Sequence, residues 1–450
     1  MRSIFLILLP VLCSLQARAE NDRFDQSLND AVQSAKLQSG SLHSSQAMKE
    51  AASFNADAAG ASLWPNLTIQ GNYFYQTVVP SLNLGPAFGN KSFGTNNNYS
   101  IGPALNYTLF DAGKNSKFHQ NAEFLAKSKD QTYHAQEAQL ELSIRQAYFR
   151  VQYALRALDL TIDSLRLSQA QSQDITVRFK AGAASKLDEV QARRDLINYQ
   201  LRFQQSQSTL SSSFRDLMAL EGDHRELDVA RPLSVAAAGA KLPEGVETPT
   251  IKLNLEPLET SLASLSQNWT FAGEAHPETQ ALEAQAQASK KLADSSMAGL
   301  YPKLVLQAKA AYEYPNLVLP ENVWQETFGA AISFPLFEDD LSRNQARDYN
   351  QQAVAAREQK EQRLTDLTRD EGKAHDALQS LQTQKKLSST NVGQAREVEK
   401  LTYYSYRAGK SRYLDVQDAN VKLLEAEVLD AQIDSEILNQ FAILSYLSTR

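Results

Sequence analysis

Two long stretches of the chain carry apolar residues at helical spacing and are poor in the residues that interrupt helices. Proline is absent from residues 104–231 and 336–450, and Gly182 is the only glycine between residues 114 and 221. Because proline and glycine break helices most strongly, the stretches predict very long helices. Apolar and small side chains step by four and three, as in a coiled-coil seam. These positions are Ile144, Tyr148, Val151, Leu155, Leu158, Ile162 and Leu165, then Leu424, Val428, Ala431, Ser435, Leu438, Ala442 and Ser445.

Gly182 and Gly409 each interrupt one of the long helical runs. A helix over residues 114–180 would be about 100 Å long at 1.5 Å per residue, so we expect a rod packed on other rods. Gly182 and Gly409 suit the left-handed position that ends a helix. Ser185 and Asp188 form a capping pair for the helix after the first turn. We therefore expect two helical hairpins, and on these residues alone the turns need only reverse the chain.

Two pairs of shorter segments alternate between apolar and polar residues with the period of a β-strand. The predicted strands are residues 66–75, 99–109, 303–314 and 327–337. In the first strand Leu67 and Ile69 share one face, whereas Thr68 and Gln70 share the other. Strands of about ten residues with one apolar face are typical of transmembrane β-strands. An antiparallel sheet on a soluble core shows the same alternation, so both interpretations stay open at this point.

The chain repeats itself. Phe179-Lys-Ala-Gly182 returns 227 residues later as Tyr406-Arg-Ala-Gly409, and the segment 105–110 returns at the same distance as 332–337. Such a duplication predicts a fold built from two similar units. Each unit contains a helix, a strand pair and a helical hairpin. The repeats are residues 20–221 and 269–450, and an irregular, proline-containing equatorial region, residues 222–268, separates them.

The first residues predict an export signal over residues 1–19. Arg2 precedes an apolar run that is too short to span a bilayer, and Ala17-Arg-Ala19 supplies small residues for cleavage. Cys13, the only cysteine, lies within this segment, so the mature chain would have neither disulfides nor thiolate ligands. Leu12 is too large for the position before a lipidated cysteine.

Charge and composition narrow the classes of function further. The net charge of −7 and the pI near 5.6 argue against nucleic acid as a partner. Six scattered histidines form no metal-binding motif, and no residues place a nucleophile beside a base. We therefore expect neither an enzyme nor a cofactor.

The second hairpin carries the most specific motif, Tyr406-Arg-Ala-Gly409-Lys-Ser-Arg-Tyr-Leu414-Asp415-Val-Gln-Asp418-Ala. With the repeated strand pairs and hairpins behind a signal peptide, it resembles the TolC-type outer-membrane factor family. The similarity covers essentially the whole mature chain, although residues 222–268 match by position only. It implies a mainly α fold with β: duplicated coiled-coil hairpins, plus four strands per protomer in a trimeric, twelve-stranded outer-membrane barrel. The chain would be the exit duct of a tripartite efflux pump or a type I secretion system.

The same resemblance implies partners and a gate. The homotrimer would lie in outer-membrane lipid and join an inner-membrane transporter through a periplasmic adaptor (membrane fusion protein). Asp188 and Tyr406 occupy the positions of a hydrogen bond that closes the pore. Asp415 and Asp418 occupy positions of acidic rings in the lumen, although aspartate is also ordinary in the first turn of any helix.

The residues expected to dock the adaptor follow the family pattern only in part. The first hairpin keeps Arg178 and Ser185 but has Ala183, and the second hairpin matches none of the three positions. Adaptor docking is therefore expected at the first hairpin.

The alternative function, from another class of protein, is a periplasmic coiled-coil scaffold or adaptor whose strands form a small soluble domain. The sequence does not indicate the exported cargo.

Overall fold

The computed structural model describes residues 23–83, 90–92, 94–222, 233–234, 251–265, 269–317, 319–338 and 340–449. The predicted signal segment, including Cys13, lies outside these residues. By their contacts, the residues divide into two compact units. The first comprises Met1–Ser39, Glu141–Asn268 and Ala374–Ile443, and the second comprises Gly40–Leu140, Trp269–Lys373 and Leu444–Arg450. Each unit takes segments from both sequence repeats.

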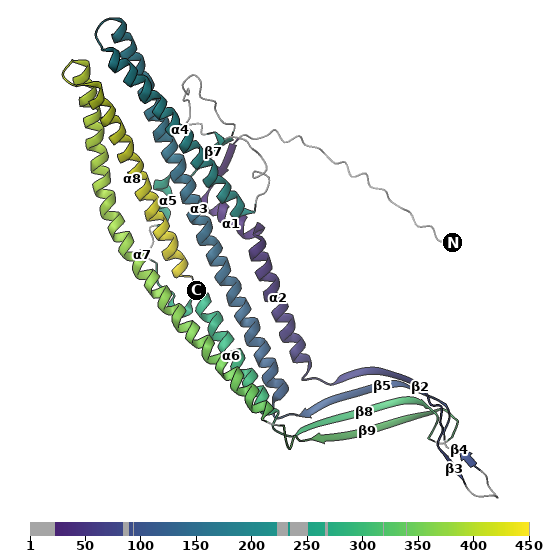
Figure 1. Ribbon diagram of the computed structural model, residues 1–450. Coiled ribbons are helices and arrows are strands. Elements are labelled where there is room, and N and C mark those ends of the chain that lie inside the picture. Colours follow the sequence, from purple (N-terminus) through teal and green to yellow (C-terminus); the bar gives the residue numbers. More distant parts are fainter. Residues whose placement is uncertain are drawn as a thin grey trace, which may run out of the picture. The chain divides into compact units, whose positions relative to one another are not determined.

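Helices make up most of the described chain, as predicted (Figure 1). The two longest, α3 and α7, contain 67 residues each, and each is the first arm of a hairpin. Their equal length reflects the duplication. The helices are α1 (Leu28–Gln38), α2 (Gly40–Ala61), α3 (Lys114–Lys180), α4 (Lys186–Glu221), α5 (Leu258–Leu265), α6 (Pro277–Ala298), α7 (Leu341–Arg407) and α8 (Tyr413–Leu447).

The seams predicted from apolar spacing are the buried faces of the helices. On α3, Ile144, Tyr148 and Val151 are fully buried. On α8, Leu438 and Ala442 are buried, and Ser435 donates a hydrogen bond to the carbonyl oxygen of Phe149 at 3.3 Å. The small residues of α8 thus allow its backbone to approach α3 closely.

Four strands form one antiparallel sheet in the second unit, in the order β2-β5-β8-β9. They are β2 (Asn66–Tyr75), β5 (Asn97–Phe110), β8 (Lys303–Tyr314) and β9 (Val323–Ser333). The register places Leu67 beside Leu105 and Tyr312 beside Trp324, so the apolar positions of all four strands share one face. This result confirms the predicted strand number and alternation.

The last strand differs from its predicted bounds. β9 begins at Val323 and ends at Ser333, where the prediction was residues 327–337. Pro335 has no amide hydrogen to donate to a neighbouring strand, so pairing stops before it. Phe334, Leu336 and Phe337 therefore follow the strand instead of continuing it.

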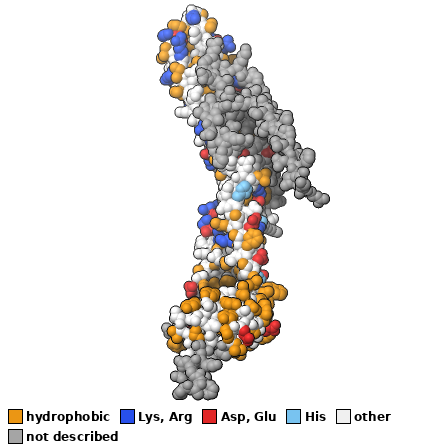
Figure 2. Space-filling model, turned by 90° about the vertical axis from the view of Figure 1, so that its right-hand side faces the viewer, with side chains coloured by type: hydrophobic (Ala, Val, Ile, Leu, Met, Phe, Trp, Pro, Cys, Tyr) orange, Lys and Arg blue, Asp and Glu red, His pale blue; other side chains and the backbone are white. Residues whose placement is uncertain are grey.

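The apolar face of the sheet is open in the single chain. Ile69 and Phe328 are about four-fifths exposed, and Trp324 is 65% exposed. Figure 2 shows hydrophobic side chains gathered over this part of the molecule. The opposite face is polar, and on it Lys309 donates hydrogen bonds to Glu313 and Ser100 at 2.9 and 3.1 Å.

The equatorial region, for which the sequence predicted no elements, contains part of a second sheet. β7 (Ile251–Leu255) pairs in parallel with β1 (Arg23–Gln26) and with β6 (Leu233–Ser234). A third sheet pairs β3 (Ser81–Asn83) with β4 (Asn90–Ser92) between β2 and β5. Within the described residues, no helix has both the length and the apolar character needed to cross a bilayer.

Gly102 allows β5 and β8 to approach each other closely. A Cβ atom at this position would lie 2.0 Å from the carbonyl oxygen of Ala310. We predict that Gly102→Ala forces the strands apart and lowers the free energy of unfolding by about 1–3 kcal/mol, as overpacking does. The midpoint of urea unfolding in detergent measures this effect. Gly329→Ala on β9 is the control because its Cβ would meet nothing within 4 Å. Equal midpoints for the two variants would contradict the prediction.

Candidate functional site

The first hairpin turns through local hydrogen bonds that its sequence dictates. Gly182 has a φ of 76°, and the amide of Ala183 donates to the carbonyl oxygen of Arg178 at 2.8 Å, which closes the end of α3. Ser185 caps α4 by accepting from the amide of Asp188 at 3.1 Å. The Asp188 carboxylate accepts in return from the Ser185 amide at 3.3 Å. This capping box fixes the direction of the Asp188 side chain.

The second hairpin repeats this turn almost unchanged. Gly409 has a φ of 72°, and the amide of Lys410 donates to the carbonyl oxygen of Ser405 at 2.8 Å. Asp415 accepts from the amide of Arg412 at 3.0 Å, as Asp188 does from Ser185. Arg412 occupies the position of Ser185 but lacks the hydroxyl oxygen, so only half of the capping box remains.

The structure brings together Asp188 and Tyr406, the pair expected to close the pore. The Tyr406 hydroxyl donates to Asp188 Oδ2 at 3.5 Å, a long hydrogen bond between the first hairpin and the second. Burial and the nearby carboxylate raise the pKa of Tyr406 to about 12. The phenol is therefore neutral near pH 7 and retains the proton that it donates.

A second link between the hairpins was not predicted from the sequence. Asp174 on α3 accepts from the Tyr403 hydroxyl at 3.1 Å and from Arg178 Nε at 3.0 Å. Arg178 also donates to the carbonyl oxygen of Arg407, near the end of α7, at 3.4 Å. Tyr403 lies three residues before Tyr406, so both phenols lie on one side of α7. The spacing of the two tyrosines can be seen in the sequence, but it does not indicate that Asp174 is the partner of Tyr403.

The predicted docking residues therefore already make contacts within the chain. The Arg178 side chain is 23% exposed and lies between the two hairpins. The Ser185 hydroxyl is used as a helix cap. Both residues lie beside the first turn, as expected, and their adaptor contact stays a prediction.

Beside these polar contacts, the four helices of the two hairpins share a small apolar core. Ile175 of α3, Ala192 of α4, Tyr406 of α7, and Tyr413 and Val416 of α8 pack together, and all are buried. The rings of Tyr406 and Tyr413 meet edge to face with their centroids 5.7 Å apart. Each hairpin tip is therefore held to the other by both polar and apolar contacts.

Asp415 and Asp418 line one groove of about 650 Å³ between α7 and α8. Each has a basic neighbour on its own helix: Asp415 lies 3.4 Å from Arg412, and Asp418 lies 2.7 Å from Lys422. The side chain of Asp418 is 61% exposed. The two carboxylates thus share a groove, as the spacing of three predicted, and both are partly neutralised within the chain.

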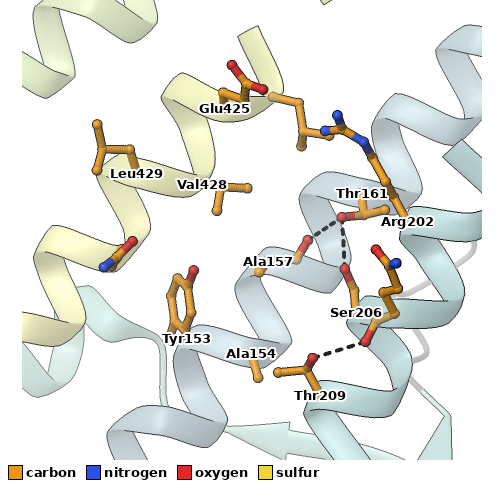
Figure 3. A pocket seen from close by; sticks show the side chains of 13 residues that line it. Tyr153, Ala154, Ala157, Thr161, Arg202, Ser206, Thr209, Glu425, Val428 and Leu429 are labelled. Carbon is orange, nitrogen blue, oxygen red and sulfur yellow. Dashed lines mark hydrogen bonds between the residues drawn. The ribbon is translucent and has the colours of Figure 1, made fainter. Parts of the chain in front are cut away.

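Further from the tips, α8 packs loosely on the first hairpin. A cavity of about 570 Å³ lies between α8 and the pair α3 and α4 (Figure 3). Small and β-branched side chains such as Ala157 and Val428 line it, and Thr161 and Ser206 hydrogen-bond at 3.3 Å across α3 and α4. A hydrogen bond thus joins the two helices of the first hairpin beside a space that α8 does not fill.

Both the sequence and the fold of the chain are similar to those of known proteins. TolC of Escherichia coli strain K12 is 24% identical over 468 aligned positions, which cover 98% of this chain and 86% of TolC. The cobalt-zinc-cadmium resistance protein CzcC of Cupriavidus metallidurans is 23% identical, with 86% of this chain and 84% of CzcC covered. The crystal structure of the outer membrane protein VceC of Vibrio cholerae superposes with a TM-score of 0.74 at 18% identity, covering 94% and 96% of the two chains.

The match to the family extends through both repeats. Residues 31–223 and 272–447 match the family described as outer membrane efflux protein. These ranges include both strand pairs and both hairpin tips, and the gap between them, residues 224–271, contains most of the equatorial region. The chain belongs to the outer membrane efflux protein family.

Proposed function

We propose that three copies of this chain form a passive duct through the outer membrane and that the hairpin tips gate it. The observation that carries the proposal is the four-stranded sheet with one exposed apolar face. β2 and β9 are its edges, and neither has a further strand partner among the described residues. Inside a bilayer such edges need partners, and neighbouring copies supply them. A periplasmic scaffold would leave this apolar face in water.

Efflux is the favoured use of the duct. The family description names efflux, and the relative CzcC is named for resistance to cobalt, zinc and cadmium. The chain would work with an inner-membrane transporter and a periplasmic adaptor, which supply the energy and the connection.

The hairpin contacts support a gate. Bonds from Tyr406 and Tyr403 to Asp188 and Asp174 hold the second hairpin on the first. Their loss would free the tip of the second hairpin, and the cavity beside α8 leaves room for that hairpin to move. In a trimer, three copies of the groove that contains Asp415 and Asp418 would face the lumen, and their carboxylates would attract cations.

The first prediction concerns the closing bond. We expect Tyr406→Phe to shift the pore toward its open state by about fivefold, because a hydrogen bond contributes about 1 kcal/mol. Single-channel conductance in planar lipid bilayers measures the shift. Tyr404→Phe is the control, because that side chain is 66% exposed on the same helix. If Tyr406→Phe conducts as the unmodified protein does, Tyr406 does not hold the gate.

The second prediction concerns the acidic groove. Asp415→Ala combined with Asp418→Ala should raise the half-blocking concentration of a trivalent cation by about tenfold, because it removes carboxylate attraction at short range. Hexamminecobalt titrated against single channels provides the measurement. Asp163→Ala, at a carboxylate with 71% exposure on α3, should leave block unchanged. Unchanged block in the double variant would refute the lumenal ring.

The third prediction concerns the adaptor. Arg178→Asp should abolish crosslinking between the first hairpin and the adaptor in whole cells, because a docking cation becomes an anion. Asp174→Asn is the matched control, since it weakens the same internal contact and leaves the guanidinium in place. Loss of crosslinking in Arg178→Asp alone supports docking. Equal loss in both variants would trace the effect to a disturbed tip and would contradict a docking role.

A further inference from the structure

The tip contains a second acid–tyrosine pair, one heptad from the first. Asp188 and Asp195 lie seven residues apart on α4, and Tyr406 and Tyr413 lie seven residues apart across the second turn. A spacing of seven returns nearly to the same face of a helix, so both acids face the second hairpin. The first pair, Asp188 with Tyr406, is the closing contact proposed above.

Asp195 is a buried carboxylate with weak pairing. Only 3% of the residue is exposed, and among the described residues neither of its carboxylate oxygens receives a well-aligned hydrogen bond. The guanidinium of Arg194 lies 3.6 Å away. Burial raises the pKa of Asp195, whereas Arg194 and the Tyr413 hydroxyl act in the opposite direction. Such a group is costly to bury unless a donor faces it, and the Tyr413 hydroxyl lies near enough to act on its pKa.

Tyr413 is buried at the first position of α8. It is 1% exposed, and its ring packs against Tyr406. Burial and then the Asp195 carboxylate raise its pKa far above the ordinary value, so the phenol stays protonated. A neighbouring contact supports the approach of the two helices: Arg194 donates to Gln417 of α8 at 3.1 Å.

The duplication shows that this pair arises from the difference between the two copies. At the repeat offset, Phe179 corresponds to Tyr406, Lys186 to Tyr413, and Lys422 to Asp195. Both tyrosines therefore occur only in the second hairpin, and Asp195 occurs only in the first. The carboxylate of the first hairpin thus faces the phenol of the second. Simple retention of a duplicated sequence would place the same residue in both hairpins and does not explain this difference.

We propose that Asp195 and Tyr413 form a second gating contact, so that the closed tip is held at two points along α4. This inference rests on the gated duct proposed above. In the first pair, Asp188 is partly exposed and its bond to Tyr406 is long, whereas Asp195 and Tyr413 are both almost fully buried. Because hydrogen bonds are stronger in a low-dielectric interior, the inner contact holds the start of α8 while the outer one loosens.

A double-mutant cycle tests the contact. Asp195→Asn, Tyr413→Phe and their combination are compared with the unmodified protein by single-channel conductance in planar bilayers. The controls are Asp163→Asn and Tyr404→Phe, which make the same chemical changes at exposed sites. We expect each single variant to raise the mean conductance at least twofold. The double variant should conduct no more than either single variant, and the controls should conduct as the unmodified protein does. Wild-type conductance in both singles, or a double effect equal to the product of the single effects, would overturn the proposal.

A second measurement does not require the chain to conduct. The only cysteine, Cys13, lies in the predicted signal, so spin labels can be placed at Lys180→Cys and Lys410→Cys beside the two turns. The distance distribution between labels should broaden in Tyr413→Phe, which keeps the ring packing and so should still fold. An unchanged distribution would refute the contact. If the unmodified protein passes no ions, the duct proposal fails, while the label distances still decide whether Asp195 and Tyr413 hold the hairpins together.

Discussion

The backbone polar groups along the sheet edges set the main constraint on this protein. β2 and β9 leave a row of amide and carbonyl groups without strand partners among the described residues. Ile69, Trp324 and Phe328 meanwhile expose a broad apolar face. In water the apolar face is unfavourable, and in lipid the unpaired edges are more so. A barrel shared by several copies would resolve both conflicts, because each copy would cover the edge of the next and the apolar face would meet lipid.

The hairpin tips show how one repeated segment can serve two roles. Both turns close in the same way, with a left-handed glycine and an aspartate that caps the next helix. The residues around them then diverge: the first hairpin supplies the carboxylates of Asp174, Asp188 and Asp195, and the second supplies phenols. Hydrogen bonds between phenols and carboxylates are modest individually. If the tips gate the duct as proposed, several such bonds together would keep it closed, and each could still break without a large input of free energy.

Local patterns predicted the fold well because they act within one element. The lack of proline and the scarcity of glycine predicted the long helices, and alternation predicted the four strands and their apolar face. The end of β9 was misplaced because alternation continues through Phe334 and Leu336, although Pro335 cannot pair. The residues of the site were harder to identify. Asp188 and Tyr406 came only from resemblance, and the Asp174–Tyr403 pair, 229 residues apart, depends on how whole hairpins pack. The internal bonds of Arg178 were missed for the same reason.

The central claim is that a single chain cannot satisfy its own sheet and that three chains can. The most direct test is the mass of the purified mature protein in detergent, measured by light scattering with the detergent contribution subtracted. The account predicts a particle with three times the mass of one chain. A stable monomer that retains its β-sheet signal in circular dichroism would contradict it.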